Sequence, residues 1–342
     1  MKTIRIGFLG TGWIASVYAK ALASMPDVRI TALCNHHVEK AEAFNAKYTQ
    51  GTAKCYADFG TMLGQSAIDA LFVCVPPGAH TGQAEAAATA GIHLMLEKPI
   101  ALSNARAASI AAAVRAANVK CQIGHHMRHS TPARKLKQML TDGSAGRPLM
   151  MQGRFFVNAL FPKWWRDPNM GGGQLIEQSI HLYDLARYFL GPADVITAFA
   201  DKLAHQRFSD YRVDDVSAST IRFRNGAIAS LCAANCAEPK SGSVNFTVLC
   251  ENVIATFQDP DHATFVHHGG RVSEEFTEAD GPVPREDVAS SSNSYDELVS
   301  NFIDAIRNDA PLRSGIDDGV EGLRLVLAAA ESSRQGGAPQ AL

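Results

Sequence analysis

Short apolar runs alternate with longer helical stretches over the first third of the sequence, and this pattern restricts the possible folds more than any other feature. The expected strands are Ile4–Leu9, Arg29–Cys34, Ala70–Val75, His93–Leu96 and Lys120–Ile123. The expected helices include Ile14–Ser24, Val38–Tyr48, Thr81–Ala90 and Asn104–Ala117. Strands that alternate with helices in this way form a parallel sheet with right-handed crossovers. The pattern therefore predicts an α/β domain in the first part of the chain.

A glycine-rich turn joins the first expected strand to the first expected helix, with the sequence Gly10-Thr11-Gly12-Trp13-Ile14-Ala15. Gly10 permits a tight turn, Gly12 lets the backbone approach a pyrophosphate, and the small Ala15 lets the helix pack closely. The helix N-terminus at Trp13 and Ile14 then faces the anion. A purely structural glycine turn is the alternative, but the strand before the turn and the helix after it favour dinucleotide binding.

The end of the second strand is where the adenosine ribose is recognised in such domains. A carboxylate there accepts from the ribose hydroxyls of NAD, whereas a basic residue accommodates the 2′-phosphate of NADP. This chain has the neutral Asn35 followed by His36 and His37, with Lys40 about one turn later. We predict that Asn35 and His36 contact the cofactor, and the choice between NAD and NADP stays open.

Two prolines follow another expected strand, in the stretch Val75-Pro76-Pro77-Gly78-Ala79-His80. They force an extended exit, which would place the backbone at Pro76 against a cofactor lying across the edge of the sheet. His80 is a candidate neighbour of the nicotinamide. The alternative is that His80 stabilises the start of its helix or faces solvent.

An apolar run that begins at Gly91 ends abruptly in Glu97-Lys98-Pro99. Ligands of open parallel sheets bind just outside the carboxyl ends of the strands, so Glu97 and Lys98 are expected beside the cofactor. The Lys98 ammonium is suited to holding a substrate hydroxyl as it becomes an alkoxide. An ordinary ion-paired lysine at a strand end is the alternative.

The pattern changes after Ile123, where a long series of strand-like runs replaces the alternation. The runs are Pro148–Val157, Val195–Lys202, Val216–Phe223, Ala227–Ala234, Val244–Leu249 and Val253–Phe257. Turns are expected at Asn225-Gly226 and Glu251-Asn252, and a further hairpin is possible at Gly269-Gly270. Residues 281–293 are expected to form a loop, and Tyr295–Arg307 and Gly319–Arg334 two closing helices.

Three glycines at 171–173 precede an expected helix over Gln174–Leu190. Within it, one arc of about 80° contains Gln174, Glu177, His181, Asp184 and Tyr188. Glu177 and His181 are one turn apart, which is the pairing expected of a positioned proton acceptor. A solvated polar stripe is the alternative.

Other polar residues are candidate substrate ligands. Trp165 and Arg166 combine an apolar face with forked donors, as in a sugar-binding edge, although a buried structural tryptophan explains Trp165 equally well. Arg128 is a further candidate for a substrate hydroxyl. Two groups of histidines, at 125–126 and at 262, 267 and 268, lack Cys or carboxylate partners at ligand spacing, so we expect solvated loop histidines and no metal site.

Length, charge and cysteine content exclude several classes of protein. A chain of 342 residues exceeds the usual size of one core, which favours two domains. The formal net charge of −2 gives no support for bulk electrostatic binding to nucleic acid or to anionic membranes. Seven cysteines, mostly within apolar runs, indicate reduced thiols in a cytoplasmic protein. Neither a signal peptide nor an apolar run of about 20 residues that could span a membrane is expected.

Taken together, the segments Gly10–Ala15, Pro76-Pro77, Glu97-Lys98-Pro99 and Gly171–Gly191 resemble the Gfo/Idh/MocA oxidoreductases in order and spacing, over essentially the whole chain. The resemblance implies a Rossmann NAD(P)-binding domain, placed at 1–123. It also implies an α/β domain, placed at 124–342, with a large, mostly antiparallel sheet that often mediates oligomerisation. We expect a homodimer or homotetramer, with the last helices packing back on the first domain.

The same resemblance implies that a histidine at the place of His181 faces a lysine at the place of Lys98, with an aspartate one turn before the histidine. Here that acid is Glu177, which is a departure from the family pattern. The predicted protein is an NAD(P)-dependent dehydrogenase of a secondary alcohol in a sugar, polyol, inositol or related compound. His181 would take the hydroxyl proton and Lys98 would stabilise the alkoxide, although either residue could be the formal base. A non-catalytic NAD(P)-binding sensor and a dehydrogenase of a cyclic diol are the alternatives.

Overall fold

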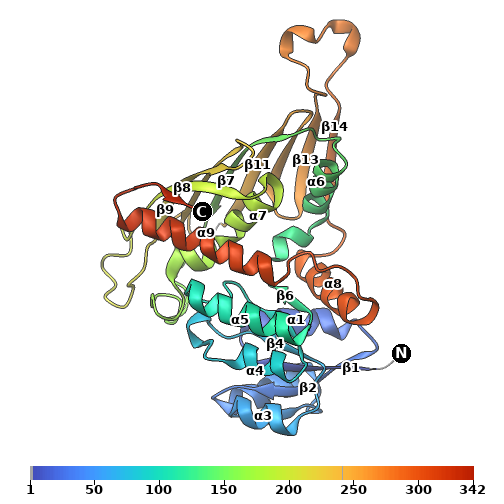
Figure 1. Cartoon of the computed structure of the whole chain (residues 1–342), viewed down its shortest axis with the longest axis vertical. Coiled ribbons are helices and arrows are strands. Elements are labelled where there is room, and N and C mark those ends of the chain that lie inside the picture. Colours follow the sequence, from blue (N-terminus) through green and yellow to red (C-terminus); the bar gives the residue numbers. More distant parts are fainter. Residues whose placement is uncertain (1–2, 241) are drawn as a thin grey trace. The chain divides into compact units, whose positions relative to one another are not determined.

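The computed structural model describes residues 3–240 and 242–342. The chain divides into two compact units. The first runs to His126 and also takes up Tyr295–Glu321, and the second comprises Met127–Ser294 and Gly322–Leu342. Figure 1 gives the labels of the helices and strands used below.

The first unit contains a six-stranded parallel sheet with the strand order β3-β2-β1-β4-β5-β6. Its strands are β1 (Ile4–Leu9), β2 (Val28–Cys34), β3 (Lys54–Tyr56), β4 (Ala70–Val73), β5 (His93–Leu96) and β6 (Cys121–Ile123). Its helices are α1 (Trp13–Ala23), α2 (Val38–Tyr48), α3 (Phe59–Gln65), η1 (Pro77–Ala79), α4 (Gln83–Thr89), α5 (Asn104–Ala117) and α8 (Ser294–Asn308, from Tyr295). This order is that of a doubly wound Rossmann fold, in which ligands bind where the strand order reverses, between β1 and β4. The predicted parallel sheet is therefore confirmed.

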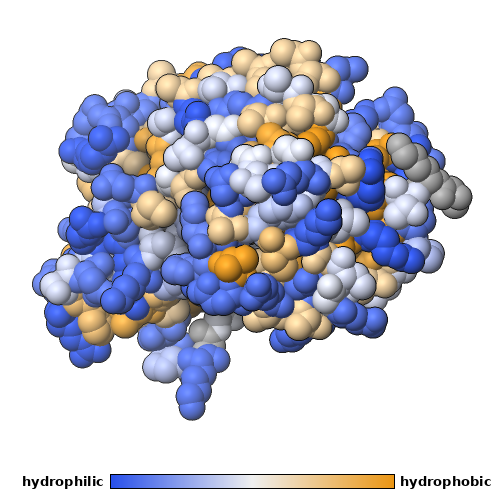
Figure 2. Space-filling model, turned by 90° about the horizontal axis from the view of Figure 1, so that it is seen from below, coloured by the Kyte–Doolittle hydropathy of each residue, from blue (hydrophilic) through white to orange (hydrophobic). Residues whose placement is uncertain are grey.

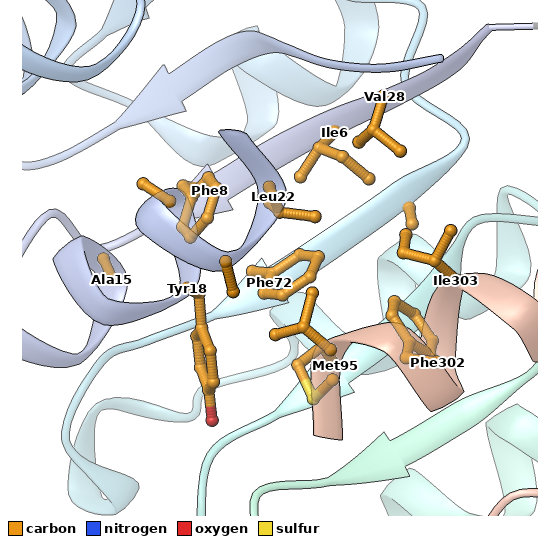
Figure 3. Packing of buried hydrophobic residues seen from close by; sticks show 14 of the residues in the cluster. Ile6, Phe8, Ala15, Tyr18, Leu22, Val28, Phe72, Met95, Phe302 and Ile303 are labelled. Carbon is orange, nitrogen blue, oxygen red and sulfur yellow. The ribbon is translucent and has the colours of Figure 1, made fainter. Parts of the chain in front are cut away.

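The core of this unit joins the sheet to a helix from the far end of the chain. Phe8 on β1 and Phe72 on β4 stack with ring centroids 5.0 Å apart, and Phe302 on α8 meets Phe72 edge-on at 5.7 Å. Figure 3 shows these rings packed with Tyr18 and Met95. The helix α8 thus completes the core of the nucleotide-binding fold, because its apolar stripe buries one side of β4.

The second unit contains a nine-stranded sheet with the order β14-β13-β12-β11-β7-β10-β9-β8-β15. Its strands are β7 (Pro148–Phe156), β8 (Ala193–Asp201), β9 (Val216–Phe223), β10 (Ile228–Ala234), β11 (Ser243–Cys250), β12 (Val253–Asp259), β13 (His262–His267), β14 (Arg285–Ala289) and β15 (Gln340–Ala341). All adjacent pairs are antiparallel except β7 with β10. The predicted large, mostly antiparallel sheet is confirmed.

Helices cover one face of this sheet (Figure 1). They are α6 (Thr131–Thr141), the π-helix η3 (Gln174–Gln178), α7 (Ile180–Leu190) and the later part of α9 (Ile316–Arg334). The short 3₁₀ helix η2 (His126–His129) precedes α6 in the chain. Phe189 of α7 contacts the rings of Phe246 and Phe257 on the covered face. Burial alternates along β7 and β10, so the opposite face of these strands is open.

Several local predictions need correction. The segment 281–293, expected as a loop, contains β14, which pairs with β13 at the edge of the sheet. The turn at Gly269-Gly270 opens a long connection with two short 3₁₀ turns, η4 (Ser273–Glu275) and η5 (Glu278–Asp280), and is not a tight hairpin. The elements β3 and α3 were not expected, because their apolar runs are too short to show a period. The Asn225-Gly226 turn is confirmed, with Gly226 at φ +89° between β9 and β10.

Polar residues cover most of the face shown in Figure 2, with apolar residues scattered among them. Such scattered apolar groups are normal on protein surfaces. Among residues 3–240 and 242–342, no helix is long and apolar enough to cross a membrane.

Candidate active site

The glycine turn after β1 has the geometry that a bound pyrophosphate requires. Gly10 has φ +91°, and a Cβ there would lie only 2.6 Å from the carbonyl oxygen of Cys74. Gly12 is the N-cap of α1, and a Cβ on it would meet no described atom within 4 Å. The first turn of α1 contains no acidic residue, and no side chain caps it from Gly12. Trp13 and Ile14 therefore begin a helix whose N-terminus suits an anion, and this chain's residues fit the cofactor.

Asn35, directly after β2, is already engaged by its own surroundings. Its Nδ2 donates to Thr11 Oγ1 at 2.8 Å, and its Oδ1 accepts from the backbone N–H of His37 at 3.0 Å. The first bond ties the end of β2 to the glycine turn. His36 is exposed beside it, and no carboxylate stands at the position of Asn35.

The proline segment after β4 is tied to the segment that follows β5. Pro76 is the N-cap of η1, and His80 ends it. His80 is buried, with its Nδ1 2.8 Å from the carbonyl oxygen of Ile100, and burial lowers the pKa of its imidazole. His80 therefore couples the two segments to each other.

Glu97 and Lys98 follow β5 at the carboxyl edge of the parallel sheet. The hydroxyl of Tyr18, on α1, donates to Glu97 Oε1, and the backbone N–H of Lys98 lies 3.2 Å from Glu97 Oε2. Gly124 leaves room for this carboxylate, because a Cβ there would lie 2.8 Å from Glu97 Oε1. Glu97 thus fixes the backbone that presents Lys98.

Four aromatic rings gather near this edge within the first unit. His126 stacks on Tyr295 with ring centroids 4.0 Å apart, and Tyr295 meets both Trp13 and Tyr18 edge-on at 6.3 Å. Burial, with the nearby Lys98 charge acting in the same direction, lowers the pKa of His126 to about 3. The prediction that His125 and His126 are solvated is wrong, since both are buried. Tyr295 lies far from the glycine turn in sequence, which is why it was missed.

In the second unit, the segment expected as one helix is wound in two ways. Its first turn, Gln174–Gln178, is a π-helix, and α7 begins at Ile180. The change occurs at Ser179, whose backbone N–H donates to the carbonyl oxygen of Gln174 at 3.0 Å and whose hydroxyl donates to that of Leu175 at 2.7 Å. Such wide turns occur frequently at functional sites.

Most polar side chains of this segment are buried and do not form a solvated stripe. Gln174 is fully buried and accepts from Ser217 Oγ at 2.8 Å, and His181 is 6% exposed. Glu177 is partly exposed, and its Oε2 accepts from Trp165 Nε1 at 2.7 Å. The carboxylate one turn before the histidine is therefore held in place from outside the helix.

Two of the predicted substrate ligands, Trp165 and Arg166, lie within the loop before the glycines. The indole of Trp165 is 1% exposed, so it offers no open face for a sugar, and the alternative of a buried tryptophan describes it better. The Arg166 guanidinium donates to the carbonyl oxygens of Leu160 and Phe161 and to Asp210. These contacts join two loops of the protein itself.

Arg128 forms a buried bidentate pair with Asp184 on α7, with both N···O distances 2.6 Å. Its guanidinium also lies over the ring of Tyr188 at 4.7 Å. Burial raises the pKa of Asp184, while Arg128 opposes this rise. Asp184 and Tyr188, which shared the expected polar arc with His181, thus anchor α7 through Arg128.

Two family models match the chain. The model of the oxidoreductase family with an NAD-binding Rossmann fold matches residues 4–125, and that of its C-terminal α/β domain matches residues 137–342. The chain belongs to the Gfo/Idh/MocA oxidoreductase family. The resemblance inferred from the sequence is confirmed, and so is a nicotinamide dinucleotide as the cofactor class of the first domain.

Curated Gfo/Idh/MocA relatives are similar over different shares of their length. Inositol 2-dehydrogenase of Rhizobium meliloti is 26% identical over 96% of this chain and 97% of the relative. D-glucoside 3-dehydrogenase of Escherichia coli is 29% identical over 66% of this chain and 68% of the relative. The uncharacterized oxidoreductase YrbE of Bacillus subtilis is 27% identical over 67% of this chain, and the match spans about two thirds (66%) of that protein.

Solved structures show the same fold over the whole length. Levoglucosan dehydrogenase in complex with NADH and L-sorbose gives a TM-score of 0.88 at 19% identity, covering 100% of this chain and 99% of that one. The WlbA dehydrogenase from Bordetella pertussis, in complex with NADH and UDP-GlcNAcA, gives 0.82 at 22% identity, with coverage of 100% and 99%.

Two further residues, Tyr18 and Asp214, contribute to the site, and no pattern in the sequence singled them out. Tyr18 lies within the apolar face of α1, where nothing distinguishes it from a core residue. Asp214 accepts from the backbone N–H of Leu175 at 2.8 Å and so caps the π-helix. Among residues 3–240 and 242–342, no group of three or more His, Cys, Asp or Glu side chains is arranged to hold a metal ion.

Proposed function

We propose that this protein is an NAD(P)-dependent dehydrogenase acting on a secondary alcohol of a sugar, polyol or inositol. Membership of the oxidoreductase family supports the reaction class. The names of its relatives, an inositol 2-dehydrogenase and a D-glucoside 3-dehydrogenase, support the substrate class.

The observation that carries this proposal is the buried His181 one turn from a carboxylate that is itself held by an indole donor. A neutral imidazole in such a setting accepts a proton from an alcohol. We assign proton acceptance to His181 and orientation of the imidazole or substrate to Glu177. A protein that only senses nucleotides has no need of such a pair.

Lys98 is assigned to stabilise the alkoxide, since an ammonium at the cofactor edge of the sheet places positive charge where negative charge develops. The nicotinamide, when bound, supplies the acceptor for the hydride, which leaves the substrate carbon that carries the alkoxide oxygen. Cofactor binding is assigned to residues that surround this edge: Gly10, Gly12, Trp13, Ile14, Asn35, His36, Pro76, His80, Glu97 and Lys98. Because Asn35 carries no charge to repel a 2′-phosphate, both NAD and NADP are proposed cofactors.

We also propose a homodimer or homotetramer through the open face of the second sheet. Met150 and Ile228 are neighbours on β7 and β10 and are 37% and 45% exposed, which leaves apolar surface for a second copy. Light scattering of an Ile228→Lys variant tests this, and an unchanged mass would reject the surface. A cytoplasmic location is proposed from the seven cysteines, all of which are free thiols.

A panel of sugars, inositols and diols, assayed for the change in nicotinamide absorbance with NAD and NADP, tests the function. We expect turnover of at least one polyhydroxylated substrate. Tight nucleotide binding without turnover of any compound would support the sensor, and preference for an otherwise apolar cyclic diol would support the third alternative.

A further inference from the structure

The strongest feature that the proposed roles leave unexplained is the bond between Trp165 and Glu177. Trp165 Nε1 donates to Glu177 Oε2 at 2.7 Å, within the second unit. A hydrogen bond to a charged acceptor is shorter and about twice as strong as one between neutral groups. The indole N–H is a donor only, so it can serve no partner except an acceptor such as this carboxylate.

The indole is packed among apolar and aromatic side chains. Trp165 is 1% exposed and lies in a small core with Tyr211 and Val213. The ring of Phe161 packs against it at 4.7 Å between centroids. A side chain fixed in this way positions its N–H without further loss of conformational freedom.

The backbone around Trp165 is fixed as well. Gly171 allows the chain to pass closely, since a Cβ there would lie 2.7 Å from Trp165 Cα. The neighbouring Arg166 joins this loop to Asp210, and Arg212 joins it through Asp167. These contacts join the loop to the segment that contains Asp210 and Arg212.

We propose that Trp165 is a positioning residue that holds the Glu177 carboxylate in register with His181, and that a glutamate is needed at this position because it reaches the indole. The inference rests on the proposed dehydrogenase function. Shortening the side chain by one methylene would withdraw the carboxylate by roughly an ångström, which is enough to break a bond of this length. Glu177→Asp and Trp165→Phe should therefore remove the same interaction.

Steady-state kinetics with the best substrate of the panel measure the energetic coupling between Trp165 and Glu177. Trp165→Phe keeps the aromatic packing but removes the donor, and we expect kcat to fall about tenfold, the scale of one hydrogen bond to a charged group. The matched control is Trp164→Phe, because Trp164 is the neighbouring indole whereas the donor to Glu177 Oε2 is Trp165. We expect the kinetics of this control to equal those of wild type. In a Glu177→Asp background, Trp165→Phe should change kcat less than about twofold.

A merely structural tryptophan gives a different result. Lost packing would lower kcat by the same factor in both backgrounds, and that outcome, or normal kcat in Trp165→Phe, would overturn the proposal. Unchanged nucleotide affinity shows that the first unit is intact.

A second readout does not depend on turnover. The chain has three tryptophans, so the indole N–H region of a ¹H–¹⁵N NMR spectrum holds three resonances, which Trp→Phe variants assign. Glu177→Asp should shift the Trp165 resonance and leave those of Trp13 and Trp164 in place. An unmoved Trp165 resonance rejects the pair, whereas a shifted one in an enzyme that turns over nothing rejects the proposed function and retains the pair.

Discussion

The two glycines of the cofactor turn should respond to substitution in opposite ways, although they are two residues apart. Gly10 has φ +91°, and a Cβ there would lie 2.6 Å from the carbonyl oxygen and 2.9 Å from the carbonyl carbon of Cys74. Gly12 has φ −81° and ψ −165°, which any residue can adopt, and its Cβ would meet no described atom within 4 Å.

For Gly10→Ala, the left-handed backbone costs about 1 to 2 kcal/mol. Overpacking against a backbone carbonyl, which cannot rotate away, costs about 1 to 3 kcal/mol more. We expect the free energy of unfolding to fall by about 2 to 5 kcal/mol, measured by urea denaturation. For Gly12→Val, the expected loss is about 1 kcal/mol, the difference between a glycine and an apolar N-cap.

For cofactor binding the order should be reversed, with Gly12→Val more harmful than Gly10→Ala. We propose that the pyrophosphate approaches the backbone at the open space beside Gly12, so valine should abolish binding of NADH and NADPH in a fluorescence titration. Normal affinity in Gly12→Val would refute the assignment of the turn, and a Gly10→Ala variant as stable as wild type would refute the packing argument.

Three further predictions concern chemistry, cofactor choice and pH. Lys98→Met and His181→Asn should each lower kcat by about 10²-fold or more while nucleotide binding survives, and because both serve one step the double variant should lose much less than the product. Asn35→Asp should shift the ratio of kcat/KM toward NAD, because the new carboxylate repels a 2′-phosphate. Asp214 is partly exposed, yet loss of contact with water raises its pKa from 3.8 to about 7. The Asp214 carboxyl therefore ionises at a lower pH in the unfolded chain than in the folded protein. The stability that the neutral carboxyl provides is present below pH about 4 and is lost as pH rises through about 7. Asp214→Asn keeps an acceptor for the Leu175 N–H and should flatten this dependence, with a higher Tm than wild type above pH about 8.

Each of these has a clear contrary outcome. Near-normal kcat in both single variants would reject Lys98 and His181 as the active site and favour the nucleotide sensor. An unchanged cofactor ratio in Asn35→Asp would place Asn35 away from the ribose. Parallel Tm–pH curves for wild type and Asp214→Asn would show that Asp214 ionises normally.

Local order was the part that the sequence determined by itself. The strand, glycine turn and helix at Gly10–Ala15, the strand that ends at Lys98 and the Asn225-Gly226 hairpin all depend on neighbouring residues, so their periods and turn chemistry were visible. The order of these segments sufficed for the family and the two-part fold. The polar arc between Gln174 and Tyr188 was visible as well, but the contacts of its side chains were not.

Only the tertiary structure decided how that arc and the cofactor edge are supported. Tyr18 and Glu97 are 79 positions apart, Arg128 and Asp184 are 56 apart, and Trp165 meets Glu177 across the triple glycine. A period along one element shows which face is apolar, but it does not show which distant side chain will supply a donor to that face. The exposure of a candidate residue likewise depends on what packs over it. That is why Trp165, His126 and His181 proved to be buried.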